Sequence, residues 1–241
     1  MDKVTIIIPV HNIIKRGFKR VLNSVQSLEL QQSYLDEIIV VDSSELRQFE
    51  MLNDLLKLTK AKHYHLPLDN FNKPKLLNYG INKAESKFIM CTDSDYIFRK
   101  DFLKECERVR GEKVIIFKEV KMLPPISNIN LSRIKTWNFP KSKFNQWKKL
   151  ANGACQYATK KFFTENPYFE EMEGFGAMDN LTAYVAYNKG LKIHWLTQSE
   201  ILHQYHQIEN KMGGTNKKKF NKNQQVLEKY RKKYNLPKLL K

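Results

Sequence analysis

The chain has 241 residues, of which 41% are hydrophobic and 28% are charged, and it contains only nine Gly and eight Pro. This composition is typical of a globular protein with one substantial core, and it excludes fibrous and intrinsically disordered classes. The 42 Lys and Arg outnumber the 25 Asp and Glu, giving a formal net charge of +17. Such a charge fits either a Lys-rich solvated surface or an anionic partner such as nucleic acid, an acidic glycan or an anionic membrane.

The cysteines and the apolar segments indicate a reducing compartment and no membrane span. Cys91, Cys106 and Cys155 are odd in number and lack a C-x-x-C spacing, so neither a disulfide framework nor a structural zinc site is expected. The opening segment MDKVTIIIPVHN has a short apolar run and no small-residue cleavage site, which is unlike a signal peptide. No apolar stretch approaches the roughly 20 residues of a membrane span. We therefore expect a soluble, cytoplasmic protein.

Strand and helix patterns alternate through the first half of the chain. Continuous apolar runs predict buried strands over residues 4–10, 37–43, 62–67, 87–92 and 112–118. Helical spacing of apolar residues predicts helices over residues 17–28, 45–58, 73–85 and 99–109. This alternation predicts an α/β fold with a mainly parallel sheet flanked by helices.

The second half is less regular. Residues 119–150 are rich in Lys and aromatic residues without periodicity, which predicts a long loop or an irregular insert. Order is predicted to resume near residues 152–163, followed by a loop and helix over 174–190 and a strand over 191–196. A basic tail from residue 207 is predicted to contain one helix at about 216–234. Neither an internal repeat nor an independent second domain is expected.

Polar side chains follow three of the predicted strands. They are His11 and Asn12, then Asp42 and Ser43, and finally Asp93, Ser94 and Asp95. In open α/β sheets, ligands bind beyond the carboxyl ends of the strands, so these residues are predicted to face one site. The D-x-D pair could be only a polar turn. Its two carboxylates also offer the oxygen ligands that Mg²⁺ and Mn²⁺ prefer.

The segment KPKLLNYGINKAESKFIMCTDSD, residues 73–95, resembles the core signature of family-2 glycosyltransferases, K-x-x-x-L-N-x-G followed by D-x-D. VTIIIPVHN is similar to the opening strand of that family. EIIVVDSS is similar to its second strand, which usually ends Asp-Asp-Gly-Ser. The resemblance covers roughly residues 3–98. It implies a GT-A fold that binds a nucleotide sugar, most simply a UDP-sugar, with a divalent cation, Mn²⁺ or Mg²⁺.

The resemblance also implies roles for the matching positions. The turn from Pro9 to Asn12 and the carboxylate of Asp42 would lie against the base, and Lys75 and Asn78 would lie near the uridine or its phosphates. Asp93 and Asp95 would straddle the ribose and the metal-bound diphosphate. The implied nucleotide-binding residues are Pro9, His11, Asn12, Asp42, Ser43, Lys75, Asn78, Asp93 and Ser94. Ser43 stands where the family usually has a second Asp, which alters base recognition.

A second resemblance concerns residues 173–181, EGFGAMDNL, which are similar to the G-W-G-G-E-D segment of the beta-galactosyltransferase-like C-terminal region. There the final Asp deprotonates the acceptor hydroxyl, and Asp179 is the matching position. Gly174, Phe175 and Gly176 would bring the backbone close to the sugar. Met178 replaces the family's Glu, so the identity of the sugar does not carry over. The alternative for Asp179 is a helix N-cap or first-turn acid.

The segment ILHQYH, residues 201–206, lies where related enzymes place a metal-binding His. We favour His203 over His206 as the ligand that joins Asp93 and Asp95, since imidazole suits Mn²⁺ beside carboxylates. The alternative is a structural role. The other strand histidines, His63, His65 and His194, are predicted to be packing residues.

Basic and aromatic residues interleave between residues 133 and 149, where Trp137 and Trp147 are candidates to contact the sugar or the acceptor. The alternative is a lid loop whose aromatics pack on the sheet. The basic tail, with Lys217–Lys219, adds to the positive field and favours a polyanionic acceptor, for which DNA with hydroxylated, exposed or flipped bases is one candidate. A cell-surface glycan or a lipid-linked sugar is the commoner task of the family. A non-catalytic nucleic-acid-binding protein on a transferase fold is a third hypothesis.

The sequence thus predicts a metal-dependent glycosyltransferase that moves a hexose-type sugar from UDP by a single inverting displacement, with retention as the alternative. Residues 1–118 would form the nucleotide-sugar-binding half of one domain. Residues 119–206 would form the acceptor and catalytic half, and residues 207–241 a basic C-terminal tail.

Overall fold

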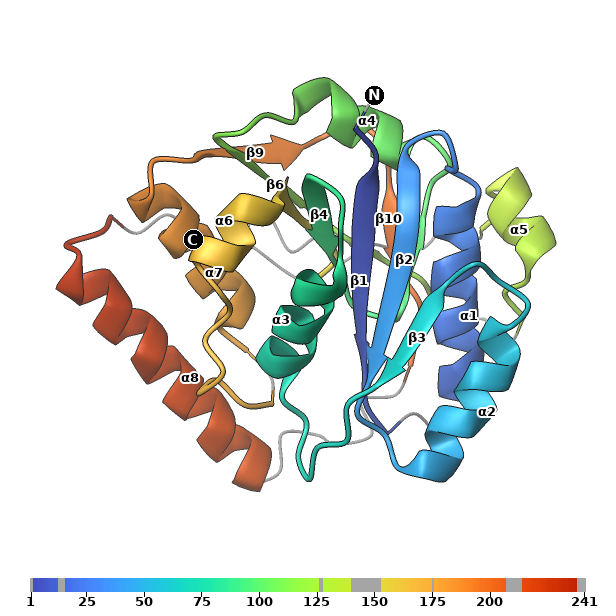
Figure 1. The fold of residues 1–241 in the computed structure, drawn as a ribbon, viewed down its shortest axis with the longest axis horizontal. Helices are drawn as coiled ribbons and strands as arrows, with labels where there is room; N and C mark the ends of the chain where they lie inside the picture. Colours follow the sequence, from blue (N-terminus) through green and yellow to red (C-terminus); the bar gives the residue numbers. More distant parts are fainter. Residues whose placement is uncertain are drawn as a thin grey trace.

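The computed structural model describes residues 2–12, 16–125, 128–139, 153–174, 176–206 and 214–237 (Figure 1). A seven-stranded sheet runs in the order β3-β2-β1-β4-β8-β6-β9. Its strands are β1 (Val4–Val10), β2 (Leu35–Asp42), β3 (Lys62–His65), β4 (Phe88–Cys91), β6 (Val114–Lys118), β8 (Gln156–Thr159) and β9 (Lys192–Leu196). Neighbouring strands are parallel except that β8 runs antiparallel to both β4 and β6. The sheet therefore joins strands from both halves of the chain.

A smaller sheet lies next to the D-x-D segment. It consists of β5 (Tyr96–Phe98), β10 (Ile201–His203) and β7 (Lys121–Met122), in the order β5-β10-β7. Strand β10 pairs antiparallel with β5, and His203 stands opposite Tyr96. This pairing brings the histidines near residue 203 to the end of the D-x-D turn.

Helices cover both faces of the large sheet (Figure 1). One face packs against α1 (Arg16–Glu29), α2 (Leu46–Leu56) and α4 (Phe102–Val109). The other packs against α3 (Lys73–Lys83), α6 (Lys160–Glu165), α7 (Met178–Asn188) and α8 (Gly214–Lys233). Alternate side chains of β1 point to the two faces, with Ile6 and Ile8 in the first core cluster and Ile7 in the second. Burial on both faces explains the unbroken apolar run of β1.

The predicted α/β fold with a mainly parallel, helix-flanked sheet is confirmed. The five strands predicted in the first half all form, with ends that differ by up to two residues. The helices near 174–190 and 216–234 form as α7 and α8. The prediction of an irregular insert over 119–150 was incomplete, because it contains β7 and α5 (Leu131–Thr136). Residues 126, 127 and 140–150 lie outside the described residues.

Four short strands, β5, β7, β8 and β10, were not predicted. Each has two to four residues, which is too short for a periodic pattern to stand out. Within the described part of the chain, no helix has both the length and the apolarity to cross a membrane.

Candidate active site

The D-x-D turn is held at both of its ends by backbone hydrogen bonds. The amide of Asp93 donates to the carbonyl of Gly153 at 2.8 Å, and the amide of Gln204 donates to the carbonyl of Asp95 at 2.8 Å. The first contact ties the turn to the segment that enters β8, and the second ties it to the segment that leaves β10. Ser94 lies between the two carboxylates and is partly exposed. The turn is therefore fixed by Gly153, 60 residues beyond Asp93, and by Gln204, 109 residues beyond Asp95.

Asp95 forms a cluster with two histidines. Its Oδ2 lies 3.1 Å from Nε2 of His203 and 3.0 Å from Nε2 of His206, and the three potential ligand atoms lie within 4.8 Å of one another. Burial opposes ionisation of the Asp95 carboxyl, but the neighbouring imidazoles outweigh it and lower its pKa. Burial likewise would lower the pKa of His203, but the Asp95 charge raises it above 6.5. The cluster is thus a compact oxygen and nitrogen donor set.

This donor set fits a divalent cation. Asp95 Oδ1 is buried without a hydrogen-bond partner among the described residues. Buried polar atoms are normally paired, so an unpaired atom beside convergent ligands is the expected sign of an ion site. A carboxylate with two imidazoles suits Mn²⁺ or another first-row cation better than Mg²⁺, which prefers oxygen ligands alone. The structure brings His206 into the cluster as closely as the favoured His203.

Asp93 faces a different partner, the ammonium of Lys73. Lys73 Nζ lies 2.6 Å from Asp93 Oδ1 and 3.3 Å from Asp179 Oδ1. Burial would lower the pKa of Lys73, but the charges of Asp179 and Asp93 outweigh it and raise that pKa. Burial also raises the pKa of Asp93. A Cβ on Gly153 would fall 1.9 Å from Asp93 Oδ2, so this contact requires glycine.

Asp179 stands at the start of α7, and three elements converge on it. Its Oδ1 accepts hydrogen bonds from Lys73 Nζ at 3.3 Å and from Gln156 Nε2 at 2.5 Å. The Oε1 of Gln156 in turn accepts from the Tyr168 hydroxyl at 2.8 Å. The N-cap of α7 is Ala177, so Asp179 is a first-turn acid that is stabilised by the helix dipole. Its side chain is 23% exposed, which leaves the carboxylate accessible from solvent.

The loop before α7 has an unusual backbone. Gly174, Gly176 and Ala177 all have positive φ, at 71°, 92° and 64°. Two glycines suit this path because the left-handed region is strained for other residues, and Ala177 takes that strain at the helix start. A Cβ on Gly176 would also fall 2.4 Å from the ring of Phe220, so α8 packs directly on the loop. Phe175, predicted to approach the sugar, lies outside the described residues.

The predicted nucleotide edge is formed by the ends of β1 and β2. His11 Nδ1 lies 2.9 Å from the Ser43 hydroxyl, and its ring stacks on Phe71 with centroids 5.3 Å apart. Asn12 adopts φ 41° and places its amide 3.1 Å from His11 Nε2. Pro9 is buried within β1. These contacts leave a polar and aromatic rim at the end of the first strand.

Asp42 is fully buried, and its carboxylate contacts other groups of the protein. Oδ1 accepts from the Ser44 amide at 2.7 Å, and Oδ2 lies 3.4 Å from His63 Nε2. Burial opposes ionisation, but the neighbouring His63 imidazole and the hydrogen bond from Ser44 outweigh it and lower the pKa of Asp42. The rings of His63 and His65 also pack against Phe49, as predicted for packing residues, and His63 additionally faces the Asp42 carboxylate.

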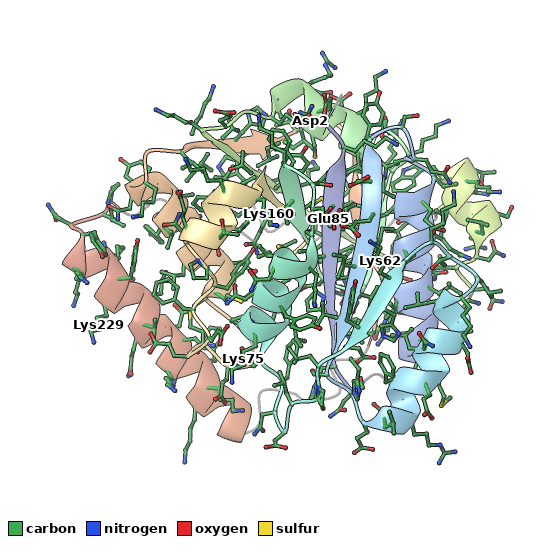
Figure 2. All side chains as sticks on the ribbon, viewed as in Figure 1. Asp2, Lys62, Lys75, Glu85, Lys160 and Lys229 are labelled. Carbon is green, nitrogen blue, oxygen red and sulfur yellow. The ribbon has the colours of Figure 1, made fainter. Side chains whose placement is uncertain are left out.

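Two residues assigned to the nucleotide, Lys75 and Asn78, lie on α3. Lys75 is exposed on the first turn of α3 (Figure 2). The Asn78 amide donates to the carbonyl of Tyr168 at 3.0 Å and to Glu170 Oε1 at 2.9 Å, and it accepts from the Tyr168 amide at 2.9 Å. Asn78 therefore fastens α3 to the segment before α7, which also holds the hydroxyl that reaches Gln156.

Of the two aromatic candidates of the second half, Trp137 is described by the structure. Trp137 ends α5, where its indole donates to Glu200 Oε2 at 3.1 Å and packs edge-on against Phe139. These contacts match the packing alternative for that segment. Trp147 falls outside the described residues.

Three residues at this site were not predicted. Lys73 is the first residue of the quoted K-x-x-x-L-N signature, so the signature contained a signal for it. Gln156 and Tyr168 gave no signal, because a lone Gln in a short strand and a Tyr after a Pro are common in any fold.

Comparison with known proteins gives one family match and several similar structures. Residues 5–109 match the model of the family described as Glycosyl transferase family 2. No curated protein matches the chain. The structure of S. aureus TarS 1–349 in complex with UDP-GlcNAc superimposes with a TM-score of 0.68 at 17% identity, covering 95% of this chain and 66% of that one. The structure of GalNAc-T7 with UDP, GalNAc and Mn²⁺ gives 0.69 at 14% identity, covering 99% and 55%.

A further structure of S. aureus TarS gives a TM-score of 0.61 at 18% identity, with 84% of this chain and 37% of that chain covered. The chain thus spans between about a third and two thirds of the length of these structures. The family match ends at residue 109, so the second resemblance, at residues 173–181, remains a prediction. Residues 5–109 therefore match a Glycosyl transferase family 2 model, and the chain as a whole shares the GT-A fold of these structures.

Proposed function

We propose that the chain transfers a hexose-type sugar from a UDP-sugar to an acceptor hydroxyl, with a bound divalent cation and inversion at the anomeric carbon. The observation that carries this proposal is the bridge of Lys73 to both Asp93 and Asp179. It joins the D-x-D turn, which the family resemblance assigns to the donor, to the carboxylate that the second resemblance assigns to the acceptor. The proposed donor side and the proposed acceptor side of the site are then separated only by the side chain of Lys73.

The cation would be held by Asp95, His203 and His206, with Asp93 as the second carboxylate of the turn. When bound, Mn²⁺ or Mg²⁺ supplies positive charge that stabilises the departing diphosphate. Lys73 supplies a second, permanent positive charge beside Asp93. The UDP and Mn²⁺ in the structure of GalNAc-T7 and the UDP-GlcNAc in that of TarS support a donor of this class.

Asp179 would act as the general base. It would take the proton of the acceptor hydroxyl while the acceptor oxygen bonds to the anomeric carbon and the bond to the diphosphate oxygen breaks. Gln156, fixed by the Tyr168 hydroxyl, holds the carboxylate in one orientation. Gly174, Phe175 and Gly176 would lie beside the sugar. A single displacement of this kind inverts the anomeric centre.

The base and ribose would lie over the ends of β1 and β2. His11 and Asn12 form the accessible part of the proposed base site, where the stacked His11 and Phe71 offer an aromatic surface. Pro9, Asp42 and Ser43 are buried behind them and would support that surface. Lys75 and Asn78 would lie near the uridine or its phosphates. Because Asn78 also fastens the segment at residues 168–170, its substitution would alter both donor binding and the position of Gln156.

The acceptor we favour is polyanionic, with DNA carrying hydroxylated bases as one candidate, supported by the net charge of +17. A cell-surface glycan or a lipid-linked sugar is the alternative, and a non-catalytic nucleic-acid-binding protein is the third. A cytoplasmic location is part of the proposal, supported by three free and buried thiols.

The test is a panel of nucleotide sugars incubated with the purified chain and Mn²⁺, with release of the nucleoside diphosphate as the readout. We expect hydrolysis of a UDP-sugar that chelation of the metal abolishes, and stimulation by hydroxymethylated DNA. Asp179→Asn and Asp95→Asn should each abolish it, whereas Asp54→Asn, on the exposed surface, should not. Release that survives both site substitutions contradicts the proposal, and so does the absence of release from every donor.

A further inference from the structure

The outward face of α8 carries an uncompensated row of lysines. Between Lys217 and Lys233 the helix has eight Lys or Arg and one Glu. Lys218, Lys222, Lys229 and Lys232 are exposed, and their spacing of four, seven and three residues puts them on one side of a helix. We call these four residues the lysine row. It extends over about 21 Å at 1.5 Å per residue.

The row points away from the domain. The opposite side of α8 carries the buried Asn223 and Leu227, and Figure 2 shows Lys229 on the side of the helix turned away from the sheet. Two other cations of the helix are neutralised, Lys219 by Glu173 and Arg231 by Glu228. Among the residues that the structure describes, no carboxylate lies within ion-pairing distance of the lysine row. Four positive charges are therefore presented to solvent in a line.

The inner side of α8 is fixed to the loop that leads to Asp179. The Asn223 amide donates to the carbonyls of Glu173 at 3.0 Å and Gly176 at 3.3 Å. Lys219 Nζ lies 3.2 Å from Glu173 Oε2, and Phe220 fills the space that a side chain at Gly176 would need. A ligand on the lysine row is thus held on the element that shapes the acceptor side of the site.

We propose that the lysine row binds a linear phosphodiester polymer through its backbone and holds an acceptor of this class on the helix that packs against the loop leading to Asp179. A straight line of unpaired cations complements a chain of regularly spaced phosphates. The row contains no aromatic side chain for base stacking, so the contact is independent of sequence. A lipid surface is disfavoured because helices that bind membranes bury an apolar face in them, whereas the apolar face of α8 packs on the domain. The acceptor part rests on the proposed function.

The test is fluorescence anisotropy with a labelled oligothymidylate of about 20 nucleotides. If four phosphates are contacted, affinity should fall about 50-fold between about 50 and about 200 mM salt. Lys222→Glu/Lys229→Glu should weaken binding about tenfold or more and flatten the salt dependence. The matched control is Lys100→Glu/Lys104→Glu, which changes the net charge equally at exposed positions on and beside α4, and it should bind almost as the wild type does. Inorganic polyphosphate, which lacks bases, should compete.

If both double variants weaken oligonucleotide binding equally, binding depends on the net charge of the whole protein and not on the lysine row, and the proposal is overturned. So would a failure of polyphosphate to compete, or binding to phosphatidylglycerol vesicles in preference to the oligonucleotide. If the Glu variant does not fold, as judged by circular dichroism, Lys222→Gln/Lys229→Gln provides the same comparison by neutralisation. UDP-sugar hydrolysis without acceptor should be unchanged in the row variants. A wild type without hydrolysis refutes the proposed function but leaves the binding result to be judged separately.

Discussion

Replacing Lys73 with Met removes the cation that Asp93 and Asp179 share. The Lys73 side chain is only 10% exposed, and its Nζ lies 2.6 and 3.3 Å from the two carboxylates. Removing one member of a buried ion pair leaves an uncompensated charge, which costs about 3–5 kcal/mol. We expect Lys73→Met to lower the free energy of unfolding at neutral pH by about this amount, measured by urea denaturation followed by circular dichroism.

The pH dependence of this loss is a second signature. The pKa of Lys73 is raised, so its contribution is fully present below its ordinary value of 10.5 and is lost as the pH rises through the folded value. In the variant, the deficit should shrink as the pH falls, because Asp93, whose pKa burial already raises, takes up a proton and loses its charge. Lys73→Met/Asp93→Asn should therefore recover part of the stability.

Lys87, which pairs with Glu112 on the exposed surface, is the matched control, and Lys87→Met should not change stability measurably. The reasoning is refuted if Lys73→Met costs less than about 1 kcal/mol, or if its cost does not change between neutral and acidic pH.

Three further predictions follow from the same site. Gly153→Ala should cost about 1–3 kcal/mol by overpacking against Asp93, and an unchanged melting temperature would contradict that. Asp42→Asn should cost about 2 kcal/mol at neutral pH. Because the pKa of Asp42 is lowered, this stability is present above 3.8 and lost as the pH falls through the folded value, so the variant and the wild type should converge in acid urea titrations. Because the pKa of His203 is raised, protons compete with the metal for this side chain. The affinity for Mn²⁺, measured by electron paramagnetic resonance, should therefore fall as the pH falls from about 8 to about 6. A constant affinity would argue against ligation by His203.

The first half of the fold could be predicted because each long strand is buried on both faces. Strand β1 is an example, since all seven of its residues are buried and the sequence shows an unbroken apolar run. Strand β8 could not be predicted, because it has four residues including the buried Gln156. What fixes β8 is its antiparallel pairing with β4 and β6, which depends on contacts far apart in sequence.

The residues of the candidate site likewise include some that sequence reasoning could predict and some that it could not. Asp93 and Asp95 follow a recognisable strand, and Asp179 precedes a recognisable helix, so sequence reasoning could single them out. Lys73 could not be assigned to them by the same reasoning, because a lysine at the start of a helix is usually solvated, and its partner Asp179 is 106 residues away. His206 lies three residues beyond the end of β10, where no periodic pattern indicates its direction.

The most direct test of the account is whether Mn²⁺ binds at Asp95, His203 and His206 together with UDP. We expect electron paramagnetic resonance titration to find one Mn²⁺ bound per chain, together with UDP. Asp95→Asn and the double variant His203→Ala/His206→Ala should each abolish that binding, and Asp54→Asn should leave it intact. Mn²⁺ and UDP binding that is unchanged in Asp95→Asn would contradict the account, because the cation would then lie elsewhere.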